Sequence, residues 1–199
     1  MLNISSRRGE RGDTIIEVLF AVTVFSLLAV GSLAVMNQGT SAAQRSLELT
    51  LVRQQIDGQA ESLRYMQASY IAAFASSTPY APNSPAGQWT KAISKGVSNA
   101  TTYGTCAAPS SAFIVNAQTV QVQDGAAVLK PADTYAKVSY APTLKAAGIW
   151  VEAIKSAGFD NPANKSPYVD FHIRACWDGP GLNVPMTTGT IVRLYEPRK

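Results

Sequence analysis

The apolar residues of this chain form a continuous run first and a periodic stripe afterwards. From Ile15 to Met36 almost every one of 22 positions is apolar or small, and about 20 helical residues cross a bilayer core of roughly 30 Å. Beyond this run, apolar or small residues recur every three or four positions, which is typical of an amphipathic helix. The members of the stripe are Leu49, Val52, Ile56, Ala60, Leu63, Met66, Tyr70 and Phe74. We therefore predict one helix from about Asp13 to about Phe74, about 90 Å long at 1.5 Å per residue.

Polar residues lie between the members of this stripe and predict a solvated face. They include Arg45, Glu48, Arg53, Asp57, Glu61 and Arg64. Arg53 and Asp57 are four residues apart, a spacing at which an ion pair can form on a helix. Gly39, which follows Asn37 and Gln38 after the apolar run, is where we expect a bend. Two helices broken at Gly39 are the alternative.

The pattern changes after the predicted helix. Residues 76–111 are rich in Ser, Thr, Ala, Gly and Pro, which excludes a regular helix across much of the segment. Its composition fits either a short helix at Trp89–Val97 or low order. From residue 112 onward, short runs of β-branched and aromatic residues between turn signals predict strands. These are Phe113–Val115, Thr119–Val122, Ala126–Leu129, Tyr135–Tyr140, Gly148–Ile154, Tyr168–Trp177 and Thr190–Tyr195, with a turn at Asp178–Gly181.

The strand at Tyr168–Trp177 has the clearest alternation of side chains. Phe171, Ile173, Ala175 and Trp177 share one face, and Asp170, His172, Arg174 and Cys176 share the other. A sheet with one apolar face and a helix with one apolar stripe can cover each other and form a single core. The predicted fold class is α+β, with a long amino-terminal helix packed on a carboxy-terminal antiparallel sheet.

One charge, Glu17, interrupts the apolar run. A carboxylate at membrane depth costs about 2.5–3.5 kcal/mol on insertion scales, so we expect Glu17 to have a partner. The preceding segment Met1–Gly12 contains Arg7, Arg8 and Arg11, and arginines on this side favour an amino terminus in the cytoplasm. A secretory signal would have its cleavage site after the apolar run. Here the candidate site, Arg11-Gly12-Asp13, precedes the run.

This arrangement, Arg11-Gly12-Asp13 followed by Thr-Ile-Ile-Glu-Val-Leu and an apolar span, closely resembles the amino-terminal signal of type IV prepilins and type II secretion pseudopilins. The resemblance implies cleavage after Gly12 by a prepilin peptidase that faces the cytoplasm, and methylation of the new amino group of Asp13. Glu17 would be the fifth mature residue and would act in assembly by neutralising that amine, in its own chain or a neighbour's. This chain has Asp13 where the family usually has Phe.

The implied protein is a subunit, of a minor-pilin type, of a bacterial type IV pilus or secretion pseudopilus, with a pilin-like fold. Residues 1–12 would be the leader, 13–38 the transmembrane and assembly half of the helix, 39–75 its amphipathic half, and 76–199 the extracytoplasmic sheet domain with the loop 76–111. The implied partners are other pilin subunits, the peptidase, a membrane platform with its ATPase, and lipid before assembly. The subunit would cross the inner membrane once, amino terminus inside, before it joins an extracellular filament.

Two alternatives remain. A minor pilin with a DNA-uptake or adhesive role would make contacts through residues 76–111 or through the basic tail Arg193, Arg198 and Lys199. A plain signal anchor would only tether the domain, with Glu17 reaching the interface. The formal charge is +4, and without the three arginines and one glutamate of the leader it would be +2. This gives little support to nucleic-acid binding, which usually shows a strong basic patch.

The two cysteines, Cys106 and Cys176, both lie in the part placed outside the membrane, where a disulfide is expected. Closing a loop of about 70 residues would stabilise the fold by roughly 4 kcal/mol in the chain-entropy description. Two buried thiols are the alternative. Two distant cysteines and one histidine lack the spacing of a metal site.

No set of residues indicates catalysis, so we predict that the chain is not an enzyme and has no cofactor. His172 is the only histidine and is expected to be a hydrogen-bonded or solvated strand residue rather than a general base. Asp124 with Asp133, and Asp160 with Asn161 and Asn164, offer oxygen ligands for calcium, but neither group has the spacing of an EF-hand. Tyr80, Trp89 and Tyr103 are candidate exposed aromatic contacts.

Overall fold

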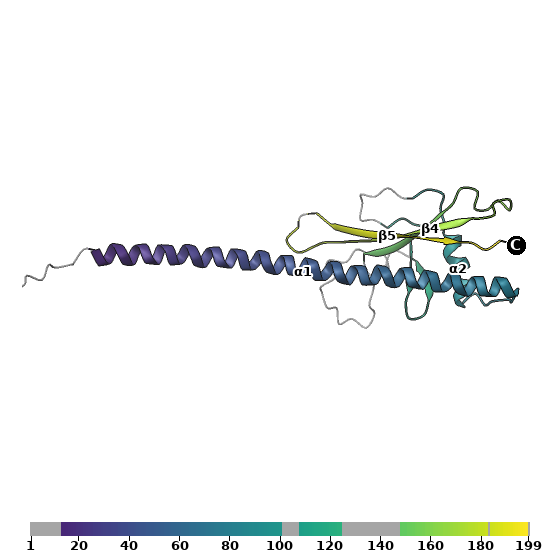
Figure 1. Ribbon diagram of the computed structural model, residues 1–199, viewed down its shortest axis with the longest axis horizontal. Helices are drawn as coiled ribbons and strands as arrows, with labels where there is room; N and C mark the ends of the chain where they lie inside the picture. Colours follow the sequence, from purple (N-terminus) through teal and green to yellow (C-terminus); the bar gives the residue numbers. More distant parts are fainter. Residues whose placement is uncertain (1–12, 101–107, 125–147, 183, 199) are drawn as a thin grey trace, which may run out of the picture. The chain divides into compact units, whose positions relative to one another are not determined.

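A computed structural model describes residues 13–100, 108–124, 148–182 and 184–198. In this part of the chain two helices precede five strands (Figure 1). They are α1 (Asp13–Ser76), α2 (Pro85–Ser94), β1 (Phe113–Asn116), β2 (Gln121–Asp124), β3 (Ile149–Lys155), β4 (Tyr168–Trp177) and β5 (Met186–Tyr195). The chain divides into two units, Met1–Ala43 and Gln44–Lys199, and the boundary lies within α1. The second unit is called the domain below.

The predicted α+β class is confirmed: a long amino-terminal apolar helix is followed by an antiparallel sheet. α1 contains 64 residues without interruption, so the alternative of two helices broken at Gly39 is wrong. A bend at Gly39 stays a prediction.

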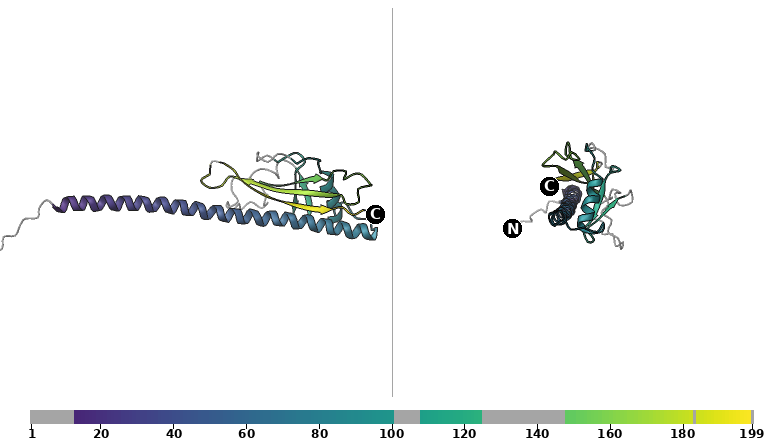
Figure 2. Two further views of the ribbon diagram at one scale, coloured as in Figure 1. Left: turned by 45° about the horizontal axis from the view of Figure 1, so that its top comes forward. Right: turned by 90° about the vertical axis from the view of Figure 1, so that its right-hand side faces the viewer.

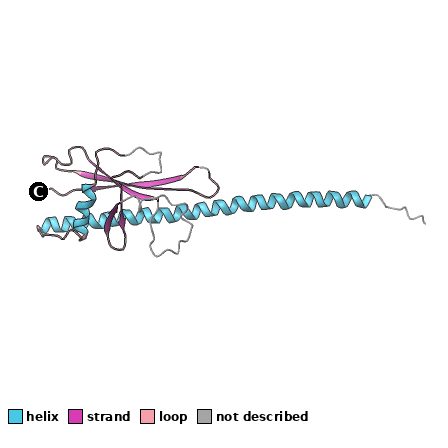
Figure 3. Ribbon diagram, turned by 180° about the vertical axis from the view of Figure 1, so that it is seen from behind, coloured by secondary structure: helices cyan, strands magenta, loops and turns pink. Residues whose placement is uncertain are grey.

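The five strands form one sheet in the order β2-β1-β3-β4-β5, with every neighbouring pair antiparallel. Figure 3 draws the strands in magenta and the helices in cyan. β4 and β5 pair along ten residues each, from Tyr168 opposite Tyr195 to Trp177 opposite Met186. β1 meets β3 only where Phe113 lies opposite Val151. Beyond that point β1 needs other partners for its backbone groups.

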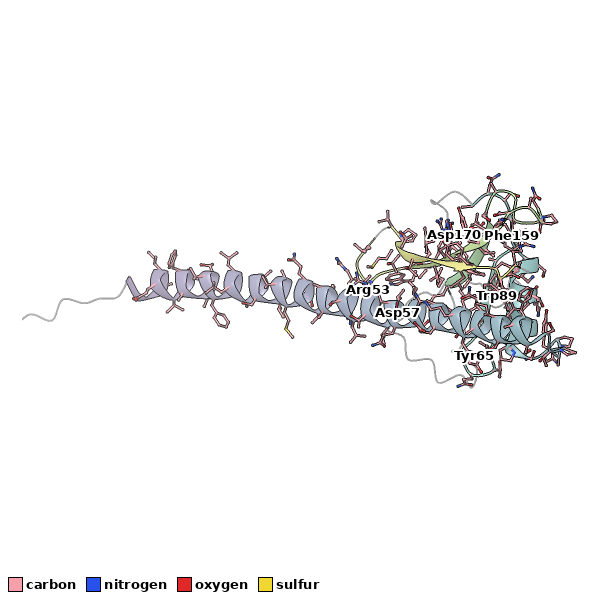
Figure 4. The ribbon with its side chains drawn as sticks, turned by 45° about the vertical axis from the view of Figure 1, so that its right-hand side comes forward. Arg53, Asp57, Tyr65, Trp89, Phe159 and Asp170 are labelled. Carbon is pink, nitrogen blue, oxygen red and sulfur yellow. The ribbon has the colours of Figure 1, made fainter. Side chains whose placement is uncertain are left out.

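The core of the domain lies between the sheet and the second half of α1. The predicted stripe supplies Val52, Ile56, Ala60, Leu63 and Met66, all buried. On the sheet side they join the same cluster as the predicted inner face of β4: Phe171, Ile173, Ala175 and Trp177. Viewed along α1, the sheet lies on one side of the helix and α2 lies next to it (Figure 2). Exposed Arg53, Asp57 and Tyr65 lie on the uncovered part of α1 (Figure 4).

α2 begins four residues before the predicted helix Trp89–Val97 and ends at Ser94. Ser84 caps its first turn, because its Oγ accepts a hydrogen bond from the Gly87 N–H at 3.2 Å. Pro85 fits the first helical position, where no N–H is needed. Our exposure prediction for Trp89 is wrong: its side chain is fully buried against α1 and the sheet.

Strand boundaries differ from the prediction where turns intervene. β2 starts two residues later than predicted because Asn116 and Val120 close a turn, and Val120 has a positive φ of 52°. β5 starts four residues earlier, at Met186, because it pairs with the whole of β4. This pairing includes Thr187-Thr188-Gly189, a run in which the glycine has a low strand propensity. The predicted strands Ala126–Leu129 and Tyr135–Tyr140 lie outside the described residues.

The outer face of the sheet is also buried at its centre, which the prediction of one apolar face did not include. Ala112, Trp150 and Cys176 form a second small apolar cluster there. Beside them, Glu152 and Arg174 are buried and approach each other at 3.6 Å between Oε2 and Nη1. Pairing of this kind is what allows two charges to be buried.

Candidate membrane and assembly site

The amino-terminal half of α1 has an apolar surface that no other described residue covers. No residue from Ile15 to Met36 is buried, and the helix is long and apolar enough to cross a membrane. Phe25 and Leu27, for example, are 72% and 74% exposed, and side chains project on every side of the helix (Figure 4). Exposure of an apolar surface of this size to water is unfavourable, and such surfaces are usually covered by lipid or by other protein.

The hydroxyl groups within this segment are bonded to the helix itself. Thr23 Oγ1 donates to the Phe20 carbonyl at 2.8 Å, and Ser26 Oγ donates to the Val22 carbonyl at 2.7 Å. Ser32 Oγ donates in the same way to the Leu28 carbonyl. Such bonds to the preceding turn satisfy hydroxyls that a hydrocarbon environment would leave without a partner. The segment is therefore compatible with lipid apart from its one charge.

That charge is Glu17, which is exposed on the second turn of α1. Asp13 is the first residue of α1, so the backbone nitrogen at the predicted new amino terminus lies one helical turn before Glu17. Gly12 lies outside the described residues. No ion pair of Glu17 is found among the described residues.

A carboxylate within the amphipathic half of α1 is buried, contrary to our prediction. Glu48, placed on the solvated face above, has 0% exposure and accepts a hydrogen bond from Trp177 Nε1 at 3.0 Å. One turn earlier, Arg45 Nε donates to the Pro180 carbonyl at 2.9 Å. These two contacts fix the end of β4 and the following turn to the first helical residues of the domain. The signal was present in the sequence, because Glu48 precedes Val52 by four residues and so lies on the stripe.

A buried glutamine performs a similar role farther along α1. Gln59 Nε2 donates to the Val115 carbonyl at 2.7 Å, and Gln59 Oε1 accepts from the Val115 N–H at 2.8 Å. The side-chain amide thus takes the place of a neighbouring strand where β1 has separated from β3. On β2, the Val122 N–H donates to Gln88 Oε1 and the Val122 carbonyl accepts from Lys91 Nζ. Both helices therefore satisfy backbone groups at this end of the sheet.

A third polar contact joins the last turns of α1 to the carboxy-terminal segment. Trp89 Nε1 donates to Glu196 Oε2 at 3.0 Å, and Tyr70 hydrogen-bonds to the same carboxylate. Burial raises the pKa of Glu196 above its usual value, although the bonds from Trp89 and Tyr70 oppose this shift. Burial and the neighbouring Glu196 charge raise the pKa of Tyr70 to about 12.

The other candidate residues are engaged in ordinary structural contacts. His172 Nδ1 lies 3.3 Å from Arg174 Nη2, and burial followed by the Arg174 charge lowers the pKa of His172. Arg193 forms a two-point ion pair with Asp170 at 2.8 Å, and Arg198 donates to the Phe159 carbonyl. Lys199 lies outside the described residues. Two members of the predicted basic tail are thus already occupied within the domain.

Among the described residues, no three His, Cys, Asp or Glu side chains form a group that could hold a metal ion. Asp124 forms an ion pair with Lys95, and Asp160 faces Lys155 at 3.5 Å. Asn161 and Asn164 accept hydrogen bonds from backbone N–H groups two residues ahead. Asp133 lies outside the described residues, as do Tyr103 and Cys106. Cys176 is buried, and its disulfide with Cys106 stays a prediction.

No family model matches this chain, and neither a curated protein nor a solved structure resembles it significantly.

Proposed function

We propose that this chain is a structural, minor-type subunit of a bacterial type IV pilus or type II secretion pseudopilus. Its leader, 1–12, is removed after Gly12 by prepilin peptidase, and α1 then carries the subunit from the inner membrane into the filament. The observation that supports this most is the order of three features along the sequence. The candidate cleavage site, Glu17 as the fifth residue after the cleaved bond, and an uncovered apolar segment all precede a domain with its own core.

The role proposed for Glu17 follows from electrostatics. Before assembly, the carboxylate lies at the edge of a bilayer. On entry into a bundle of like helices, the amine of Asp13, released by cleavage, neutralises it. Opposite charges attract far more strongly in a low dielectric than in water, while a buried charge without a partner is strongly unfavourable. Pairing therefore favours the assembled position of the helix over a misaligned one. The platform and its ATPase supply the work of extraction.

The alternatives receive less support. A DNA-uptake role needs free basic groups, and the contacts of Arg193 and Arg198 occupy two of the three proposed. A plain anchor explains the apolar segment but gives no reason for Glu17 or for the glycine before Asp13.

Mass spectrometry of the mature amino terminus in the native host tests the proposal. We expect a chain that starts at Asp13 and expect Gly12→Val to block its formation. Glu17→Ala should be cleaved normally but enter filaments poorly, while Glu17→Asp serves as the control that keeps the charge. An intact Met1, or equal incorporation of Glu17→Ala and the parent chain, would refute the proposal or its pairing step, respectively.

A further inference from the structure

The two edges of the sheet differ in how their outer backbone groups are bonded. β2 is only four residues long, and its Val122 N–H and carbonyl bond to Gln88 Oε1 at 2.7 Å and to Lys91 Nζ at 2.8 Å. β5 forms the opposite edge and is ten residues long. Folded proteins usually protect such an edge, because a row of unpaired N–H and C=O groups can bind another strand.

The register between β4 and β5 shows which backbone groups of β5 point outward. The Glu196 N–H donates to the Pro167 carbonyl at 2.9 Å, so these two residues form a hydrogen-bonded pair. In an antiparallel ladder such pairs alternate with pairs whose backbone groups point away from the partner strand, and β4 and β5 keep one register throughout. Besides Tyr195, the residues of β5 that point away from β4 are therefore Thr187, Gly189, Ile191 and Arg193.

The central part of this edge has no partner in the described part of the chain. At the end of the strand, Gln67 Nε2 donates to the outward Tyr195 carbonyl at 2.7 Å. The outward backbone groups of the other four residues form no such bond with a described residue, and all four residues are exposed. These four residues, called the open edge below, therefore offer their N–H and carbonyl groups to a further strand.

The open edge also lacks the features that usually block strand addition. β5 contains no proline, and its register with β4 has no bulge. Its single charge, Arg193, is held by the two-point ion pair with Asp170, and Arg193 Cζ lies 3.9 Å from the centre of the Tyr168 ring. Two residues earlier, on the same face, Ile191 is 60% exposed. A partner strand would therefore meet an apolar side chain beside a fixed positive charge.

Charge complementarity indicates which kind of strand fits this edge. β5 contains one arginine and no acidic residue, and the chain as a whole has a formal charge of +4. Two copies of β5 would bring only like charges to a shared edge, whereas an acidic side chain opposite Arg193 would be attracted. An apolar side chain opposite Ile191 would cover it. A segment of another protein thus fits the open edge better than a second copy of this chain does.

We propose that the open edge binds an extended, acidic segment of another protein, which joins the sheet as an antiparallel strand next to β5. Backbone hydrogen bonds supply the affinity, and the side chains opposite Ile191 and Arg193 set the register. The site lies within the domain. It goes beyond the proposed function, because it requires neither cleavage after Gly12 nor assembly through α1.

Peptide binding to the full chain in detergent micelles tests this inference. The probe is a fluorescent peptide, Thr-Val-Glu-Thr-Ile-Thr-Tyr-Thr-Thr, whose antiparallel register places its Glu opposite Arg193 and its Ile opposite Ile191. The control peptide is N-methylated at Glu, Ile and Tyr, so it keeps the side chains but loses the N–H groups that would face β5. In the chain, Ile191→Pro removes an outward N–H without removing a bond to β4, and Ile191→Val keeps that N–H as the matched control.

Fluorescence anisotropy measures the affinity, and amide hydrogen exchange locates the bound strand. We expect the probe to protect the Gly189, Ile191 and Arg193 amides, which should exchange fast in the chain alone. N-methylation of the peptide, or Ile191→Pro in the chain, should weaken binding at least about tenfold. Replacement of the peptide's Glu by Lys should also weaken binding, and Ile191→Val should bind like the parent chain.

Equal affinity for the probe and its N-methylated control, or no binding of the probe, would overturn the inference, and neither result depends on whether Ile191→Pro folds. Equal affinity for the Glu and Lys peptides would overturn the acidic partner. Slow exchange of the three amides before the probe is added would also overturn the inference. Slow exchange that depends on protein concentration would identify a second copy, and slow exchange that does not would identify coverage by the chain's own residues.

Discussion

A single buried carboxylate does much to define how the sheet meets α1. Glu48 accepts a hydrogen bond from Trp177 in a site without solvent. We expect Glu48→Ala to lower the free energy of unfolding by about 1–3 kcal/mol, because the buried indole N–H loses its acceptor. Glu48→Gln keeps a carbonyl oxygen in place and should cost less.

Urea unfolding followed by far-ultraviolet circular dichroism measures both variants. In a Trp177→Phe background the loss caused by Glu48→Ala should shrink, because the donor is already gone. An equal loss in the two backgrounds would show that the hydrogen bond is not the cause.

Ionisation of Glu196 should make the free energy of unfolding of the domain depend on pH, with a sign that can be predicted. Burial raises the pKa of Glu196 in the folded state, so the folded state binds its proton more tightly than the unfolded chain does. The stability from this group is present below the unfolded pKa and is lost as the pH rises through the folded pKa. Glu196→Gln cannot ionise and retains an acceptor for Trp89 Nε1.

The stability of Glu196→Gln relative to the parent should therefore increase as the pH rises from about 4 to 7. Unfolding curves at several pH values measure the difference, which cancels the opposite contributions of Asp170 and His172, whose pKa values are lowered. A difference that is constant or decreases with pH would contradict this assignment.

Among the elements, the two helices contain glycines in opposite situations. A Cβ on Gly58 of α1 meets nothing within 4 Å, whereas one on Gly87 of α2 would lie 2.4 Å from the Ala81 carbonyl oxygen. Gly58→Ala should stabilise the domain by about 0.5–1 kcal/mol, because alanine loses less backbone entropy in a helix. Gly87→Ala should destabilise it, since backbone atoms must move. Thermal unfolding of the two variants compares them directly; destabilisation by Gly58→Ala would count against the open space found there.

The sequence predicted best those elements whose apolar positions all face the same hydrophobic core. The stripe from Val52 to Met66 and the inner face of β4 are confirmed, because both belong to one continuous core. The alternation did not predict that Arg174 and Cys176, on the outer face of β4, are buried as well. The bounds of β5 were missed because Gly189 lowers local strand propensity, and pairing with β4 overrides that preference. α2 was misplaced because Pro85 was read as a breaker instead of a first-turn residue.

The polar contacts were harder to predict for a different reason. Glu48, Gln59 and Gln88 are buried. Each forms a hydrogen bond with one residue of a strand that is distant in the sequence. The periodicity of the sequence shows that a polar residue lies on an apolar stripe. It does not show which backbone group will bond to that residue, because this depends on where two strands separate. Gly12 and Glu17 of the proposed assembly site stay predictions, which rest on the spacing of residues along the sequence.

For the molecule as a whole, all the buried side chains among the described residues belong to one of its two units, Gln44–Lys199. Every residue of the main core cluster lies between Val52 and Leu194, while no residue from Ile15 to Met36 is buried. The fragment Gln44–Lys199 should therefore unfold cooperatively and remain monomeric in water. The full chain should need detergent or lipid, because its exposed apolar segment would otherwise drive association.

Analytical ultracentrifugation of the fragment and of the full chain, with and without detergent, measures this difference. Circular dichroism of the fragment checks that α2 and the sheet are retained. As a matched variant, full-length Leu27→Arg with Leu28→Arg places charges in the apolar run without touching the core, and should lower vesicle binding while domain stability stays unchanged. A full chain that is monomeric without detergent would mean that the apolar half of α1 is covered by this chain's own residues, and a fragment that fails to fold would mean that the domain needs residues before Gln44. The case for lipid and neighbouring helices as its partners would then lose its physical basis.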